Sequence, residues 1–105
     1  MTDAMLVYVT AKSRDDALAL GRACVEARLA ACANVIDGMH SVYRWQGAVE
    51  EADEAVLLLK TQGFRLEALT RLIRAQHAYD CPCVVAVPVL GGNPDYLAWI
   101  AESCN

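Results

Sequence analysis

The pattern of hydrophobic and polar positions at the start of the chain predicts a strand followed by a helix. Residues 5–10 form a short, mostly apolar run that is rich in β-forming side chains, which is typical of a strand. Ser13 then offers an N-cap with the acidic residue Asp16 three positions later, so a helix is predicted over residues 14–29. Apolar positions recur at helical spacing in this segment and place Cys24 on the core face of the helix.

The middle of the chain predicts a long β-ribbon. Residues 32–45 are extended in pattern, with a bulge expected at Gly38, and residues 48–61 return after a tight turn at Gln46-Gly47. Fourteen residues of strand reach roughly 46 Å at about 3.3 Å each. The first helix covers only about 24 Å at 1.5 Å per residue. The ribbon should therefore overhang the domain, and we expect the overhang to pair with a neighbouring chain.

The last part of the chain predicts two more helices with a strand between them. A helix is expected over residues 64–77, a buried strand over 84–87 that Pro88 stops, and a final helix over 94–103. The resulting order is βαββαβ with an extra C-terminal helix. This order indicates an α+β, ferredoxin-like split βαβ sandwich with helices on one face of an antiparallel sheet, in a single domain over residues 1–105.

Composition adds an expectation about assembly. Hydrophobic residues make up 56% of the chain, above the roughly 45–50% that is usual for globular proteins. The surplus suggests that apolar surface is buried between copies of the chain as well as within one copy.

Charge and cysteine content narrow the partners and the setting. The net charge of −4 and the acidic pI near 5.0 argue against nucleic acid or an anionic membrane as a partner. The start of the chain lacks the pattern of a signal peptide and no apolar run is long enough to span a bilayer, so a cytoplasmic protein is predicted. Five cysteines, an odd number, are expected to stay reduced in that setting.

Five phrases of the sequence resemble the CutA family of divalent-cation tolerance proteins. They are ARLAACANV at 27–35, SVYRWQGAVEE at 41–51, LLLKT at 57–61, HAYDCP at 77–82 and GNPDYLAWI at 92–100. The resemblance implies a ferredoxin-like subunit, a homotrimer built by pairing long ribbons, a cytoplasmic bacterial setting and a link to copper and other divalent cations. It implies no organic cofactor. Relatives bind copper(II), with a histidine of the fourth phrase as a suspected ligand, and share their architecture with the PII signalling trimers.

The segment HAYDCPC, residues 77–83, is the candidate metal site, with His77, Cys81 and Cys83 as ligands. Imidazole suits copper(II), whereas thiolates suit copper(I) and zinc. The segment departs from the family pattern, because Ala78 replaces a proline and the two cysteines stand where an aliphatic residue and a glutamate are common. Two other interpretations stay open: the cysteines are small apolar fillers at the start of a strand, or they form a strained redox pair.

A second candidate site is a ligand cleft between subunits. Tyr43, Trp45, Lys60 and Asp80 lie in family-matched phrases and are predicted to converge there, with His77 close by. The alternative function is a PII-like signalling module that binds a small anionic ligand through Lys60 and reports to an unidentified protein partner. The aromatic pair is equally consistent with packing at the trimer interface.

Enzymatic activity is the weakest hypothesis. His77 and Asp80 offer an acid and a base, but nothing marks a nucleophile, a phosphate-binding loop or a metalloprotease motif, so a non-enzymatic protein is predicted. The acidic run from Glu50 to Glu54 is interpreted as a solvated strand edge rather than as a cation site.

Overall fold

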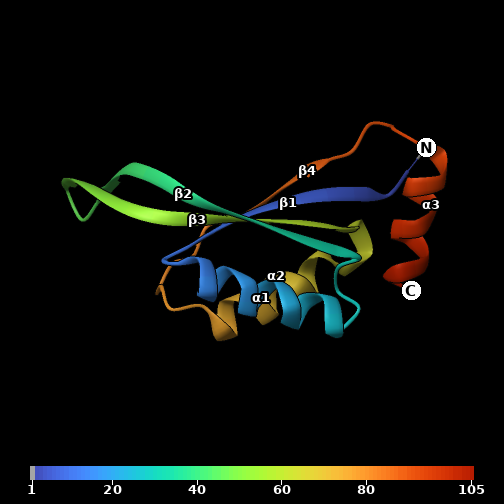
Figure 1. Cartoon of the computed structure of the whole chain (residues 1–105), viewed down its shortest axis with the longest axis horizontal. Coiled ribbons are helices and arrows are strands. Elements are labelled where there is room, and N and C mark those ends of the chain that lie inside the picture. Colours follow the sequence, from blue (N-terminus) through green and yellow to red (C-terminus); the bar gives the residue numbers. More distant parts are fainter. Residues whose placement is uncertain (1) are drawn as a thin grey trace.

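Four strands form one antiparallel sheet in the computed structural model, which describes residues 2–105 (Figure 1). In chain order the elements are β1 (Ala4–Ala11), α1 (Arg14–Glu26), β2 (Cys32–Trp45), β3 (Ala48–Gln62), the 3-10 helix η1 (Gly63–Arg65), α2 (Leu66–Gln76), β4 (Val84–Pro88) and α3 (Pro94–Ser103). The strands lie in the order β2-β3-β1-β4. Figure 1 shows α1 and α2 side by side on one face of the sheet and α3 at its end, near both termini. The predicted α+β architecture and element order are confirmed; Met1, the first residue of the predicted domain, lies outside the described residues.

The helix boundaries follow local signals, with two differences from the prediction. Ser13 caps α1, since its hydroxyl accepts the Asp16 backbone N–H at 3.1 Å. The helix ends at Glu26 rather than at residue 29, because Arg28 adopts a positive φ of 60° and turns the chain away. The second helix begins with η1 at 63–65, so its α-helical part is shorter than the predicted 64–77.

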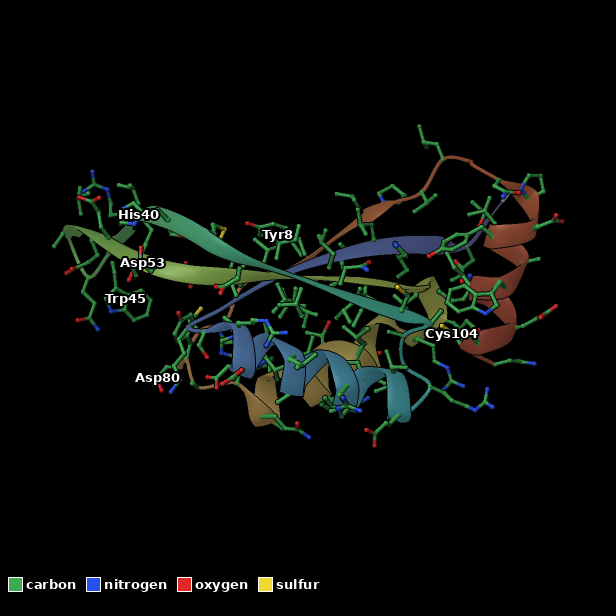
Figure 2. All side chains as sticks on the ribbon, in the orientation of Figure 1. Tyr8, His40, Trp45, Asp53, Asp80 and Cys104 are labelled. Atoms are coloured by element: carbon green, nitrogen blue, oxygen red, sulfur yellow. The ribbon has the colours of Figure 1, made fainter. Side chains whose placement is uncertain are left out.

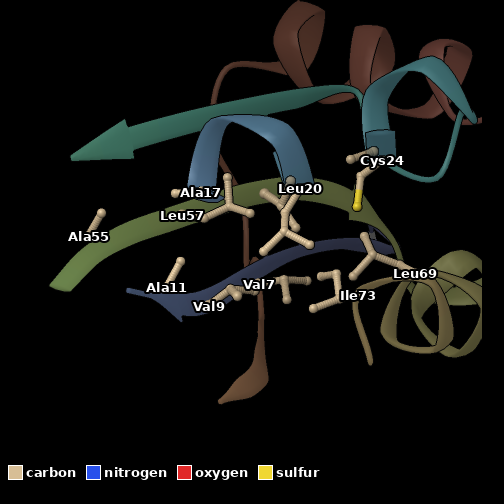
Figure 3. Close-up of a cluster of buried hydrophobic side chains, with 12 residues drawn as sticks. Val7, Val9, Ala11, Ala17, Leu20, Cys24, Ala55, Leu57, Leu69 and Ile73 are labelled. Atoms are coloured by element: carbon tan, nitrogen blue, oxygen red, sulfur yellow. The ribbon is translucent and has the colours of Figure 1, made fainter. Parts of the chain in front are cut away.

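The main core lies between the sheet and the pair α1 and α2 (Figure 3). Val9 and Leu57, paired across β1 and β3, are fully buried on the sheet's helical side together with Ile73 of α2. Cys24 is fully buried among them, which confirms its predicted core position. The packing is close: a Cβ added at Gly21 of α1 would lie 2.8 Å from the Cβ of Ala33.

A second cluster closes the end of the sheet where α3 lies. Cys104 is fully buried there and packs with Ala4 and Ile100. The Arg65 Nε donates to the backbone oxygen of Cys104 at 2.7 Å, so η1 and the end of α3 are joined. Cys104, next to the last residue of the chain, is therefore part of the packed interior.

The ribbon formed by β2 and β3, residues 32–62, carries the features that were predicted for it. Gln46 and Gly47 form the tight turn with φ of 50° and 83°, and Gly38, with φ of 81°, lies in a bulge between Ile36 and Met39. The ribbon extends beyond the helices (Figure 1) and gives the chain a long axis of 44 Å against 24 and 23 Å for the others. The predicted overhang is confirmed, whereas its pairing with a neighbouring chain stays a prediction.

The described helices include none that is both long enough and apolar enough to cross a bilayer.

Candidate functional site

His77 lies directly after α2 and uses both ring nitrogens within its own chain. Its Nε2 donates to the Thr10 carbonyl oxygen at 2.7 Å, and its Nδ1 accepts the Tyr79 backbone N–H at 3.0 Å. These partners require the neutral imidazole with the proton on Nε2, because a carbonyl only accepts and an N–H only donates. A metal ion would have to displace one of these two hydrogen bonds to reach His77.

Tyr79 connects the segment after α2 to the ribbon. Its hydroxyl donates to Glu54 Oε2 at 2.7 Å, and Glu54 is only 8% exposed. Burial, and after it the hydrogen bond and charge of Glu54, raise the pKa of Tyr79 well above its usual range. The sequence interpretation placed Glu54 in a solvated acidic edge and missed this contact. The alternation of side chains along a strand could have indicated this contact, because it places Glu54 on the opposite face of β3 from Asp53.

A groove of about 620 Å³ opens between the ribbon and residues 78–83, hereafter the 78–83 loop. Its walls include Tyr43, Trp45 and Glu54 from the ribbon and Tyr79, Asp80, Cys81 and Cys83 from the loop. Figure 2 shows Trp45 on the side of the ribbon that faces Asp80, while His40 points to the other side. Five of the seven residues predicted as metal ligands or cleft residues are therefore brought to one groove; His77 lies beside it and Lys60 lies elsewhere.

Lys60 lies at the opposite end of the ribbon. It pairs with Cys32 across β2 and β3, and its Nζ donates to Asn34 Oδ1 at 3.0 Å and lies 5.5 Å from the centroid of the Tyr96 ring. Ten residues of β3 separate Lys60 from Glu50, the partner of Tyr43, which is roughly 33 Å at 3.3 Å per residue. Within one chain the predicted cleft is thus incomplete, and a neighbouring chain would have to supply Lys60 to it.

The two thiols of the loop differ in their surroundings. Cys81 is exposed, whereas Cys83 is partly buried at the start of β4. Burial first, and the negative charge of Glu54 second, raise the pKa of Cys83. A thiolate at Cys83 is therefore disfavoured unless a cation lies close to it.

His40 forms a cluster on the ribbon for which the sequence interpretation had no role. Its Nδ1 lies 2.9 Å from Asp53 Oδ1 and its Nε2 lies 2.8 Å from Glu51 Oε1. The Asp53 and Glu51 contacts, in that order, raise the pKa of this exposed histidine. The carboxylates occupy opposite sides of the ring and so do not converge on one point. Across residues 2–105, no group of three or more His, Cys, Asp or Glu side chains is arranged to hold a metal ion.

Family membership follows from the sequence and the fold together. The family model of the CutA1 divalent ion tolerance protein matches residues 5–103. The chain belongs to this family. The resemblance inferred from the five phrases is thereby confirmed.

Relatives and solved structures agree over almost the whole chain. The divalent-cation tolerance protein CutA of Thermus thermophilus is 42% identical over 98 residues, which cover 93% of this chain and 95% of the relative. The chloroplastic protein CutA of Arabidopsis thaliana is 41% identical over 94% of this chain. The chain spans only 54% of the length of that relative. The crystal structure of CutA from Xylella fastidiosa superposes with a TM-score of 0.96 at 36% identity, covering 99% of this chain and all of the other.

The matched family and the Thermus relative are named as tolerance proteins rather than as enzymes. Because the Arabidopsis relative is chloroplastic, family membership does not define a compartment, and the cytoplasmic setting stays a prediction.

Proposed function

We propose that this chain is the subunit of a non-enzymatic, homotrimeric divalent-cation tolerance protein that binds copper(II) and other divalent cations of borderline or soft character. The proposed ligands are His77, Cys81 and Cys83. The observation that carries the proposal is the meeting of two thiols and two carboxylates, Asp80 and Glu54, at one groove of a chain that belongs to this family. Thiolates and imidazole match borderline and soft cations, and neighbouring carboxylates favour any cation that approaches.

Ion binding would require a local change, because the described residues do not form a ready three-ligand site. His77 Nδ1 would become free if the Tyr79 N–H moved away, and this nitrogen faces the loop that carries both thiols. A cation would also favour deprotonation of Cys83, which the protein alone disfavours. We therefore propose that the 78–83 loop closes around the ion, and no organic cofactor takes part.

The homotrimer is proposed on the shape and surface of the subunit. The sheet face opposite α1 and α2 leaves large apolar side chains exposed, among them Tyr8, Ile36, Val85 and Val87. Both outer strands, β2 and β4, have an edge that no strand within residues 2–105 pairs with, and such edges pair readily with another strand. Light scattering at micromolar concentration should give a mass of three chains, and a monomer mass would contradict the proposed assembly.

Isothermal titration of the reduced, metal-free protein with copper(II), zinc(II) and nickel(II) tests the ligand set. We expect the His77→Ala variant and the Cys81→Ser, Cys83→Ser double variant each to weaken copper uptake by at least about tenfold, equivalent to about 1.4 kcal/mol. Zinc is the redox-inert comparison, since thiols can reduce copper(II) but not zinc. Cys32→Ser is the matched control, because Cys32 is a partly exposed thiol near Lys60, away from the groove. Copper uptake that survives all these changes unaltered would exclude the proposed ligands.

A further inference from the structure

Thr10, near the end of β1, contacts two of the proposed metal ligands. Its carbonyl oxygen accepts the hydrogen of His77 Nε2, with the two heavy atoms 2.7 Å apart. Val9 and Val84 form the last pair between β1 and β4, so the residues that come next, Thr10 and Cys83, lie beside each other and line the same groove. We propose that Thr10 is the positioning residue of the ion site and that His77 Nδ1 is the nitrogen that binds the ion. This inference rests on the proposed function, since it concerns the support of that same site.

The contacts of Thr10 tie both ends of the 78–83 loop to an inner strand of the sheet. His77 directly precedes the loop, and Cys83 is its last residue. β1 lies between β3 and β4, and Thr10 is paired with β3. A strand that is held on both sides positions a ligand more precisely than a loop does. The exposed Cys81 lies within the loop and is the proposed ligand that can move toward an ion.

The hydrogen bond to Thr10 decides which nitrogen of His77 can bind an ion. Donation from Nε2 keeps the proton there, so the free lone pair of the neutral ring is on Nδ1. Histidines that bind metal ions almost always donate their other ring N–H to a carbonyl, a carboxylate or a water molecule. His77 already has this arrangement. Ion binding at Nδ1 then requires only that the backbone N–H of Tyr79, which belongs to the 78–83 loop, moves away.

The second contact of Thr10 acts on the Cys83 sulfur. Burial and the charge of Glu54 raise the pKa of this thiol, whereas hydrogen bonds from the side chain and the backbone of Thr10 act in the opposite direction. A hydrogen bond with that effect is donated to the sulfur, because it favours the charged form. Thr10 thus accepts a hydrogen bond from one proposed ligand and donates to the other. Both contacts are made within one chain, so they do not depend on whether a neighbouring chain covers the groove.

Long-range proton–nitrogen NMR spectra of the His77 ring test the assigned nitrogen on the full chain. In the metal-free protein at a pH near 8 we expect the proton on Nε2. With cadmium-113 as the probe we expect scalar coupling from the metal to Nδ1, while Nε2 keeps its proton. A proton on Nδ1 in the metal-free protein, or coupling of cadmium to Nε2, would overturn this inference and leave the proposed metal site standing. No change at either nitrogen at saturating cadmium would exclude His77 as a ligand and overturn both proposals.

Variants of Thr10 examine its hydroxyl separately from its carbonyl. Thr10→Val removes the hydroxyl and keeps a β-branched side chain of similar shape, and we expect cadmium binding to weaken about tenfold. The proton of His77 should stay on Nε2 in this variant, because the backbone carbonyl remains. Thr10→Ser keeps the hydroxyl and should bind cadmium within about twofold of the unchanged protein. Thr70→Val on α2 is the matched control for loss of a threonine hydroxyl and should leave binding unchanged.

A double-mutant cycle distinguishes positioning of the sulfur from general support of the fold. In a Cys83→Ala background, Thr10→Val should weaken cadmium binding by less than about twofold, because the sulfur on which the hydroxyl acts is already gone. An equal loss with and without the Cys83 sulfur would show that Thr10 supports the fold rather than the ligand, and it would overturn the assigned role. Unaltered cadmium binding by Thr10→Val in the otherwise unchanged protein would overturn it as well.

Discussion

The Tyr79 hydroxyl and the Glu54 carboxylate meet at 2.7 Å, which joins the loop after α2 to the middle of β3. The contact supports two features at once. It gives a nearly buried carboxylate a donor, and it fixes the loop that carries Asp80, Cys81 and Cys83 against the ribbon.

Replacing Tyr79 by phenylalanine should destabilise the fold and loosen the loop. The change leaves Glu54 Oε2 without its donor, and an unsatisfied buried acceptor costs about 1–3 kcal/mol. Urea denaturation should show a lower free energy of unfolding, and amide exchange should accelerate in the loop. Tyr96→Phe is the control, because the Tyr96 hydroxyl makes no hydrogen bond to any described residue. Equal stability of the two variants would show that the Tyr79 contact contributes nothing.

The contacts of His40 predict a pH-dependent stiffness of the ribbon. The carboxylates of Asp53 and Glu51 raise the His40 pKa above its usual value near 6.5. A raised folded pKa means that the folded state binds the proton more tightly than the unfolded chain does. The contribution of the His40 contacts to the stability of the ribbon is therefore fully present below pH 6.5, and it is lost as pH rises through the pKa of His40 in the folded state. NMR titration of His40 should give a midpoint above 6.5, and amide exchange around residue 40, corrected for its intrinsic pH dependence, should rise across it.

His40→Gln should remove that pH dependence, since an amide does not titrate in this range. His77, the other histidine of the chain, stays in place as an internal reference. A His40 midpoint at or below 6.5 would mean that the two carboxylates do not hold the imidazole in solution.

Four of the five thiols should react with iodoacetamide in an order that the structure defines. Cys81 is exposed and should react first, whereas burial raises the pKa of Cys24 to about 11 and keeps it both protonated and covered. Cys83 should react more slowly than Cys81, because burial and Glu54 raise its pKa. Cys104 is fully buried and should be modified only after unfolding.

Mass spectrometry of the native protein over time, at a pH near 8, measures this order. A Cys81→Ser variant identifies the first modified peptide without ambiguity. Labelling of Cys24 at the rate of Cys81 in the folded protein would contradict the buried position of Cys24.

Sequence alone predicted the fold well because its local signals agree with one another. The predicted cap at Ser13 forms, and Gly47 and Gly38 both adopt the positive φ that a tight turn and a bulge require. These signals act within a few residues, so they can be recognised without knowing the tertiary structure. The predicted end of α1 was wrong because Arg28 adopts a positive φ, which the sequence does not indicate at a residue other than glycine.

The site was only partly predictable because its contacts are non-local. Tyr79 and Glu54 are 25 residues apart, and no motif joins them. His77 was identified as a ligand by residue type, yet its ring nitrogens bind backbone groups, which leave no mark in a pattern of side chains. Lys60 shares a ribbon with Tyr43, but only coordinates reveal the distance between them.

The bulge at Gly38 sets the phase of everything beyond it. β2 uses one residue more than β3 between the pairs Ile36–Val56 and Met39–Glu54, so Tyr43 and Trp45 fall on the same face as Glu54. If the same residues paired without the bulge, every position of β2 beyond Asp37 would shift by one residue relative to β3. Val42 and Arg44 would then turn toward the 78–83 loop, and the β2 side of the groove would present an aliphatic and a basic side chain in place of two aromatic rings. The chemistry of the groove thus depends on the pairing register of β2 with β3 as much as on the residues themselves.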